Sequence, residues 1–292
     1  MPVWLRFALG LFFALLALAV AWWPRPERTA LNAAGQRVPE LSLVLAARDI
    51  EYCGPATPCG PGRRTDTVFY LRLVGRRAYA VAIPRDLKVE LPGYAGKINA
   101  VYGFLGAEGL ERAVEQVIGL KVEHHVILTL DLVRRVVDAL GGVEVYLPAP
   151  MDYDDNAANL HIHLPAGRQT LNGEEAVGYM RFRGWEGSDL GRLDRIKGVL
   201  IELVKKATGP AYWPRLPGIL RQVWADLETD LSLDQALVFL PYLRGLELST
   251  ATLPVREAGP YLVVDDAMRA RFLRDFFGIG LGEAVESSRP RR

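Results

Sequence analysis

The stretch TDTVFYLRLVGRRAYAVAIPRD, residues 65–86, sets the architecture of this chain. Two runs rich in aliphatic, β-branched and aromatic residues, Thr67–Val74 and Ala78–Ile83, predict two consecutive strands. The pair Arg76-Arg77 between them suits a short turn, so the two strands are predicted to form a β-hairpin.

Strand and helix patterns alternate on both sides of this hairpin. Leu41–Ala47 predicts a strand upstream, and Ala107–Ile118 shows helical spacing that ends at Gly119. The further predicted elements are strand His125–Leu130, helix Leu132–Leu140, strand Val143–Leu147, helices Gly173–Met180, Leu193–Ala207, Pro217–Leu227 and Leu233–Leu243, strands Leu248–Leu253 and Tyr261–Val264, and helix Asp266–Phe277. This alternation predicts a layered α/β domain around a mixed sheet.

Length and composition indicate one large globular domain. The chain has 292 residues, of which 50% are hydrophobic and 24% are charged, and these proportions allow a sizeable core. The formal net charge is only +1, so nothing at the level of the whole chain favours a nucleic acid as partner. An anion-binding site must therefore be built locally.

The first residues form an apolar segment that predicts a membrane anchor. Arg6 is followed by an uninterrupted run of apolar and small residues, Phe7–Trp23, which as a helix spans roughly 26 Å of a bilayer core of about 30 Å. No clear cleavage site follows, so a retained transmembrane helix is favoured over a cleaved signal peptide, which stays an alternative. We expect an anchor at 1–24, a linker at 25–40, a folded domain at 41–280 and a polar tail at 281–292.

Two cysteines bear on the compartment of the folded domain. Cys53 and Cys59 lie in a turn-rich stretch, CGPATPCG, that can bring their Cβ atoms into bonding range. A local disulfide implies an oxidising location, so the domain is expected on the extracytoplasmic side of the cell membrane. Reduced structural thiols are the alternative, and a zinc site is disfavoured because no second cysteine pair or well-spaced histidine pair accompanies them.

Arginine recurs near the ends of the predicted elements. Asp66 precedes one strand, and Arg85 and Asp86 follow another. Arg181 and Arg183 follow a helix, so all of these side chains are expected to project from loops at the rim of the sheet. One guanidinium group can donate two parallel hydrogen bonds to phosphate oxygens, and aspartates can hold a Mg²⁺ that bridges such oxygens. The set suits a pyrophosphate, whereas any one arginine taken alone is as well explained by a surface salt bridge.

Seven segments carry a family resemblance. They are Arg-Arg-Thr-Asp-Thr (63–67), Ile-Pro-Arg-Asp (83–86), Lys-Ile-Asn-Ala (97–100), Leu-Gly-Gly-Val-Glu-Val (140–145), the stretch Leu-Pro-Ala-Gly-Arg-Gln-Thr-Leu-Asn-Gly-Glu-Glu-Ala (164–176), Arg-Phe-Arg (181–183) and Ser-Asp-Leu-Gly-Arg-Leu-Asp-Arg (188–195). With these residues in this order, the chain resembles the LytR-CpsA-Psr family of bacterial cell-envelope proteins, from about Leu41 to Phe277.

The resemblance implies a fold and an activity. The fold is a three-layer α/β/α sandwich around a mixed sheet, with a long apolar pocket for a polyprenyl chain. The activity is a Mg²⁺-dependent phosphotransfer that attaches a teichoic acid, capsule or related glycopolymer from a polyprenyl-pyrophosphate carrier to peptidoglycan and releases polyprenyl phosphate. The lipid carrier and the peptidoglycan acceptor are thus the expected partners.

The resemblance also assigns roles to single residues. Asp49 and Asp66 match the two aspartates that hold Mg²⁺, and Asp189 matches an acidic residue that orients an arginine or deprotonates the acceptor hydroxyl. The matches to the pyrophosphate ligands are Arg85, Lys97, Arg181, Arg183 and Arg192. Asp66, Arg85 and Asp189 are accordingly the expected catalytic residues.

Two departures from the family pattern keep other functions open. Ile196 stands where the family usually has glutamine, which removes one polar phosphate contact. The loop between Asp49 and Asp66 is longer and holds the cysteines, which makes Asp49 the weakest match. Hydrolysis of the same pyrophosphate and a non-catalytic, lipid-binding or regulatory role are the alternatives, whereas a DNA-binding regulator is disfavoured.

Two further patterns allow a site without requiring one. The segments His125–Leu130, Leu132–Leu140 and Val199–Val204 offer apolar walls for a lipid, although the same pattern is typical of a filled core. If His161 and His163 lie on a strand, they share one face of it, so a transition-metal pair is a minor alternative to an ordinary surface role.

Overall fold

The computed structural model describes residues 26, 29–31, 35–48, 50–54, 57–156, 160–182 and 189–278, with the backbone alone for residues 31, 50–54, 57–59, 61, 189 and 190. The predicted anchor at 1–24 and the polar tail at 281–292 lie outside these residues. Among the described helices, none combines the length and the apolar character needed to cross a bilayer.

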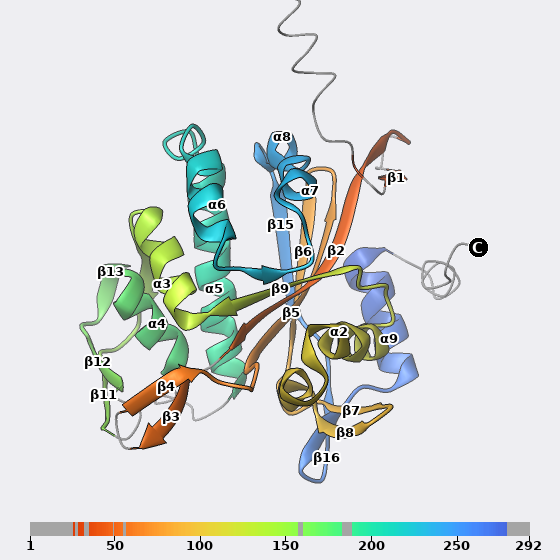
Figure 1. The fold of residues 1–292 in the computed structure, drawn as a ribbon, viewed down its shortest axis with the longest axis horizontal. Coiled ribbons are helices and arrows are strands. Elements are labelled where there is room, and N and C mark those ends of the chain that lie inside the picture. Colours follow the sequence, from red (N-terminus) through yellow and green to blue (C-terminus); the bar gives the residue numbers. More distant parts are fainter. Residues whose placement is uncertain are drawn as a thin grey trace, which may run out of the picture.

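A mixed sheet forms the centre of the fold (Figure 1). Its strand order is β14-β9-β2-β5-β6-β15, and β1 pairs with β2 beside this path. The strands are β1 (Thr29–Leu31), β2 (Arg37–Arg48), β5 (Thr67–Val74), β6 (Arg77–Ile83), β9 (His124–Thr129), β14 (Glu228–Thr229) and β15 (Glu247–Thr252). The pairs β2–β9 and β6–β15 are parallel, and the others are antiparallel. The predicted mixed sheet is confirmed.

The central hairpin β5–β6 turns one residue earlier than predicted. Val74 pairs with Arg77, so the turn consists of Gly75 and Arg76 and not of Arg76 and Arg77. Gly75 has a φ of 57°, a value that glycine adopts at little cost. An added Cβ there would lie 3.1 Å from the Cβ of Val38, so the close approach of β2 also favours glycine.

Helices cover both faces of the sheet because side chains alternate along its strands. On one face, Val68, Tyr70 and Val81 pack against α2 (Ile98–Ile118), and α9 (Asp266–Phe272) continues into the π-helical turn η1 (Leu273–Phe277) on the same face. On the other, Phe69 and Ala80 pack against α5 (Asp189–Thr208). The short helices are α6 (Leu216–Trp224), α7 (Leu233–Leu237) and α8 (Leu240–Leu243), and Val238 and Phe239 between the last two pack against β2. The described residues thus form three layers.

A second apolar cluster lies beside the sheet, around the helices α3 (Leu130–Ala139) and α4 (Gly173–Arg181). Two small hairpins complete it, namely β10–β13 (Val143–Leu147 with Gly167–Leu171) and β11–β12 (Met151–Asp155 with Leu160–Leu164). The remaining strand pairs are β3–β4 (Ile50–Gly54 with Thr57–Pro61), β7–β8 (Lys88–Leu91 with Tyr94–Lys97) and β16–β17 (Arg256–Ala258 with Tyr261–Val263). Most of these short strands lack the long apolar runs that predicted β5 and β6.

Three larger differences separate the structure from the sequence-based prediction. The helix predicted from Ala107 begins at Ile98, and a kink at Gly106 separates its two parts. The helix predicted over Leu233–Leu243 is broken in two because Pro241 has no N–H to continue the helical hydrogen bonds. Strand pairing also starts within the predicted linker at 25–40, where β1 and the first residues of β2 already pair.

Candidate active site

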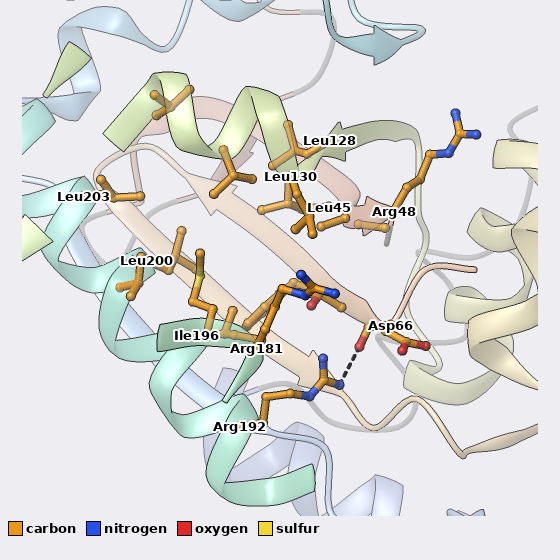
Figure 2. Close-up of a pocket in the computed structure, with 18 of the residues that line it drawn as sticks. Leu45, Arg48, Asp66, Leu128, Leu130, Arg181, Arg192, Ile196, Leu200 and Leu203 are labelled. Atoms are coloured by element: carbon orange, nitrogen blue, oxygen red, sulfur yellow. Dashed lines mark hydrogen bonds between the residues drawn. The ribbon is translucent and has the colours of Figure 1, made fainter. Parts of the chain in front are cut away.

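A pocket of about 310 Å³ opens between the sheet and the helices α3 and α5 (Figure 2). Apolar side chains form most of it, and charged side chains lie at one end. The residues that line it are Leu45, Ala46, Ala47, Arg48, Asp66, Thr67, Phe69, Leu128, Leu130, Val133, Val136, Tyr153, Asp155, Leu160, Met180, Arg181, Arg192, Ile196, Val199, Leu200 and Leu203. Such a pocket suits an amphiphile with an apolar chain and an anionic head.

One face of α5 forms a long wall of this pocket. Arg192, Ile196, Leu200 and Leu203 recur at the spacing that keeps residues on one side of a helix. Eleven residues separate the first from the last, which corresponds to about 16 Å along the axis. Figure 2 shows Leu200 and Leu203 away from the charged end. All three segments predicted to offer apolar walls contribute lining residues.

Two arginines and an aspartate come together at the charged end. Arg192, on the first turn of α5, is only 5% exposed, and its Nη2 donates to the main-chain oxygen of Asp66 at 2.8 Å. Arg181, the last residue of α4, points toward the same place in Figure 2. These three predicted site residues therefore line one pocket, although Asp66 precedes β5 and the two arginines lie on different helices.

The carboxylate of Asp66 accepts hydrogen bonds from two sides. Asn99 Nδ2 donates to Oδ1 at 2.7 Å, and Arg85 Nη1 donates to Oδ2 at 3.1 Å. Burial raises the pKa of Asp66, but the hydrogen bond from Asn99 and the charges of Arg85, Arg192 and Arg64 outweigh it, so the pKa lies below 3.8. Asp66 is thus a carboxylate at neutral pH.

Arg85 and Lys97 stand behind the pocket and do not line it. Arg85 Nε lies 3.6 Å from Asp86 Oδ2, and Lys97 Nζ lies 2.6 Å from Asp86 Oδ1. Asp66, Arg85, Asp86 and Lys97 therefore form a row of alternating charges that leads away from the pocket. In this row Arg85 contacts Asp66, which lines the pocket, whereas Lys97 is joined to Arg85 only through Asp86.

Several predicted site residues fall outside the described side chains. Asp49 and Arg183 lie outside the described residues, and Asp189 is described only as the backbone of the first residue of α5. Cys53 and Cys59 belong by their backbone to the antiparallel strands β3 and β4. Their side chains are outside the described part, so the disulfide stays a prediction.

Sequence reasoning missed two residues at the charged end. Asn99 holds Asp66 directly, and it stood unassigned within the quoted segment Lys-Ile-Asn-Ala. Arg48 also lines the pocket, and its Nε donates to the main-chain oxygen of Gly62 at 2.9 Å. It directly precedes Asp49 in the sequence, so its place next to a matched residue was the available signal.

Ile196, the departure from the family pattern, is buried in the wall of the pocket. It is 8% exposed and packs against Phe69, Ala80 and Ala82 of the sheet. Arg195 turns the other way, where its guanidinium donates to the main-chain oxygens of Tyr179 and Phe182. The substitution therefore extends the apolar wall by one helical turn at the place where a polar group was expected.

Asn99→Ala is expected to lower the free energy of unfolding by about 1–3 kcal/mol. Asn99 is 2% exposed, and the change removes the hydrogen bond that its amide donates to the carboxylate of Asp66. Because the pKa of folded Asp66 lies below 3.8, its charge stabilises the fold above that pH, and this contribution is lost as the pH falls below it. In the variant the pKa of folded Asp66 should rise toward its ordinary value, so this pH-dependent loss of stability should be smaller. Chemical unfolding from pH 7 down to pH 3 would measure both effects, and equal unfolding curves would contradict them.

Comparison with known proteins gives one family. The model of the LytR_cpsA_psr family matches residues 44–269. The probable cell wall biosynthesis protein LcpB of Corynebacterium glutamicum is 37% identical over 57% of this chain and 39% of its own length. The polyisoprenyl-teichoic acid–peptidoglycan teichoic acid transferase TagV of Bacillus subtilis is 28% identical over 56% of this chain and 44% of its own length. The matched regions thus cover less than half of either relative.

Solved structures confirm the fold. The crystal structure of B. subtilis TagV superposes with a TM-score of 0.67 at 22% identity and covers 85% of this chain and 99% of that one. A structure of TagT, a B. subtilis protein, bound to LIIa-WTA superposes with a TM-score of 0.60 at 22% identity, over 82% of this chain and 91% of that one. At such identities the likeness establishes the α/β fold around the mixed sheet.

Proposed function

Because the chain belongs to the LytR-CpsA-Psr family, we propose that it is a phosphotransferase that moves a glycopolymer from a polyprenyl-pyrophosphate carrier onto peptidoglycan. The names of two relatives support the proposal, since TagV is called a teichoic acid transferase and LcpB a probable cell wall biosynthesis protein. The observation that carries the proposal is the pocket, which joins an apolar helical wall about 10 Å long, from Ile196 to Leu203, to a charged end with Asp66, Arg181 and Arg192. The polyprenyl chain occupies the apolar part in this proposal, and its pyrophosphate lies at the arginines.

The charged end fits a magnesium ion as well as a pyrophosphate. Mg²⁺ takes oxygen ligands, usually one or two carboxylates together with substrate phosphates and water. Asp66 is ionised, and its carboxylate oxygens are ligands of the kind that Mg²⁺ takes. Asp66, with Asp49 as the second ligand expected from the family, would hold the ion. When bound, Mg²⁺ would neutralise the negative charge that develops on the phosphoryl group during transfer.

The residues of the chain then share the work of transfer. Arg181 and Arg192 bind the non-bridging oxygens of the pyrophosphate and hold the two phosphorus atoms in place. Arg85 keeps Asp66 oriented, and Asp189 takes the proton of the acceptor hydroxyl. The hydroxyl oxygen forms a bond to the glycan-linked phosphorus, the pyrophosphate bridge breaks, and polyprenyl phosphate leaves. In this proposal the anchor at 1–24 keeps the pocket beside the membrane that supplies the lipid.

An assay with the full chain tests the proposal. The purified protein is incubated with a polyprenyl-pyrophosphate-linked oligosaccharide, peptidoglycan fragments and Mg²⁺, and the products are followed by mass spectrometry. We expect polyprenyl phosphate and glycan-linked peptidoglycan, both dependent on Mg²⁺. Free phosphorylated glycan formed without peptidoglycan would instead indicate a hydrolase. Lipid that is bound but not converted would indicate a binding role, which the apolar Ile196 favours.

Leu203→Trp is expected to shorten the pocket at its apolar end. Each methylene that no longer fits loses about 0.8 kcal/mol, so a long-chain polyprenyl pyrophosphate should bind about 10-fold or more weakly, whereas a short-chain analogue should be unaffected. The matched control is Ile201→Trp, because Ile201 lies on the same helix and is 41% exposed. Calorimetric titration of both variants with both ligands gives the comparison. Equal losses for short and long chains would contradict the proposed lipid position.

A further inference from the structure

The hairpin β11–β12 presents two aspartates and two histidines on one face. Asp154 pairs directly with His161, and Asp152 pairs with His163. All four side chains are exposed, whereas Ile162, which lies between the two histidines, is buried in the second apolar cluster. Strand alternation and register thus bring the four groups together on a rigid scaffold.

Three of these groups have the spacing of metal ligands. His161 Nδ1 lies 2.5 Å from Asp154 Oδ1, and His163 Nε2 lies 3.4 Å from the same oxygen. The three ligand atoms all lie within 4.8 Å of one another. Two ligands of a tetrahedral zinc ion lie about 3.4 Å apart, given zinc–ligand bonds of about 2.0–2.2 Å. Small rotations of the side chains therefore place one ion between them.

The fourth group, Asp152, lies where it can orient His163 without binding the ion itself. His163 Nδ1 lies 2.5 Å from Asp152 Oδ1, and its other ring nitrogen, Nε2, faces Asp154. A histidine that binds a metal through one nitrogen usually donates the N–H of the other to a carboxylate, which fixes the ring and makes it more basic. Asp152 and His163 already have this arrangement.

We propose that Asp154, His161 and His163 bind a divalent transition metal ion such as Zn²⁺, with Asp152 orienting His163. A water molecule takes the fourth position of a tetrahedral ion. Imidazole nitrogen favours zinc, copper or nickel over magnesium, so this site differs in chemistry from the carboxylate and phosphate site at Asp66.

The ion would lie on the outer side of a wall of the lipid pocket. Tyr153 and Asp155 of β11 and Leu160 of β12 alternate with the four groups and line the pocket. Phe182 packs edge-on against Tyr153, with ring centroids 6.2 Å apart. A metal that joins β11 to β12 would therefore hold this wall of the pocket in place.

A competing cluster provides an internal comparison. Glu111, His125 and Asp230 also place three ligand atoms within 4.8 Å of one another. His125 Nδ1 lies 2.8 Å from Glu111 Oε1 and 3.3 Å from Asp230 Oδ1, so one nitrogen already serves both carboxylates. That cluster offers one imidazole, whereas the β11–β12 face offers two. The chain has four histidines in all, two near each cluster.

The test is a zinc titration of the full, metal-stripped chain in excess Mg²⁺. We expect one Zn²⁺ to bind through the hairpin, and His161→Asn with His163→Asn to weaken this binding at least about 100-fold, since the loss of an outer partner alone costs about 10- to 100-fold. The matched control, His124→Asn with His125→Asn, should retain the binding. Asp152→Asn keeps all three ligands and should weaken binding by about 10- to 100-fold.

Two spectroscopic readouts complete the test. Bound Co²⁺ should show the visible absorption of a four-coordinate ion without a thiolate charge-transfer band, and Zn²⁺ should slow amide hydrogen exchange in residues 151–164 of the wild type but not of the double variant. The proposal is overturned if the wild type binds no zinc at micromolar concentration, if the His161 and His163 variant binds it unchanged, or if the Co²⁺ spectrum shows cysteine ligation.

Discussion

Asp66→Asn will lower glycopolymer transfer by about 1000-fold or more and abolish its dependence on Mg²⁺. The change removes the negative charge that would hold the ion, and metal-assisted charge stabilisation of a transferring phosphoryl group is worth several kcal/mol. Asparagine keeps the size of the side chain, and the hydrogen bond from Arg192 to the main-chain oxygen of residue 66 does not need the carboxylate. Transfer is measured by mass spectrometry over a range of Mg²⁺ concentrations.

The control for this variant is Asp131→Asn. Asp131 lies on α3 and forms exposed ion pairs with Arg134 and Arg135. None of these three residues lines the pocket. Replacement of Asp131 should leave transfer unchanged, because exposed ion pairs contribute about 0–1 kcal/mol to stability. A fully active Asp66→Asn protein that still responds to Mg²⁺ would remove Asp66 from the proposed metal site.

Arg192→Lys will weaken the binding of polyprenyl pyrophosphate by about 10- to 100-fold. Lysine keeps the positive charge but loses the planar fork, so it cannot both donate to the main chain of Asp66 and hold a phosphate oxygen in the same geometry. One lost charge-assisted hydrogen bond corresponds to about 1.5–3 kcal/mol. Equilibrium binding of a prenyl pyrophosphate measures the effect, and the thermal unfolding of the variant checks that the fold is retained.

Arg135→Lys is the matched replacement away from the pocket. Arg135 is an exposed arginine on α3 that pairs with Asp226 and Asp131. Because lysine can form the same exposed pairs, lipid binding should not change. If Arg192→Lys also bound the lipid as tightly as the wild type, Arg192 would serve only to hold Asp66.

Several elements with a clear periodic pattern were predictable from the sequence. β5 and β10 have the predicted bounds, and α4 differs from the prediction by one residue at its end. The hairpin β11–β12 was missed because β11, Met151–Asp155, holds three aspartates and only two apolar residues. Strand pairing with β12, and not the apolar pattern, determines its conformation.

The candidate site was predictable only in part. The resemblance brought Asp66, Arg181 and Arg192 to one place, as the structure does. The hydrogen bond from Asn99 to Asp66 joins residues 33 positions apart, and no local sequence pattern predicts it. Nor could the sequence separate a pocket from a filled core, since Leu200 and Leu203 would show the same helical spacing in either case.

The use of one helix to line the pocket from Arg192 to Leu203 has a consequence for how its length can change. Each residue added to an α-helix turns everything beyond it by about 100°, so one inserted residue after Arg192 would rotate Leu200 and Leu203 out of the pocket. An insertion of seven residues completes nearly two turns, restores the face and adds about 10 Å. Insertions in this helix can therefore change the length of the wall only in steps close to whole helical turns, whereas finer changes must come from the size of the lining side chains.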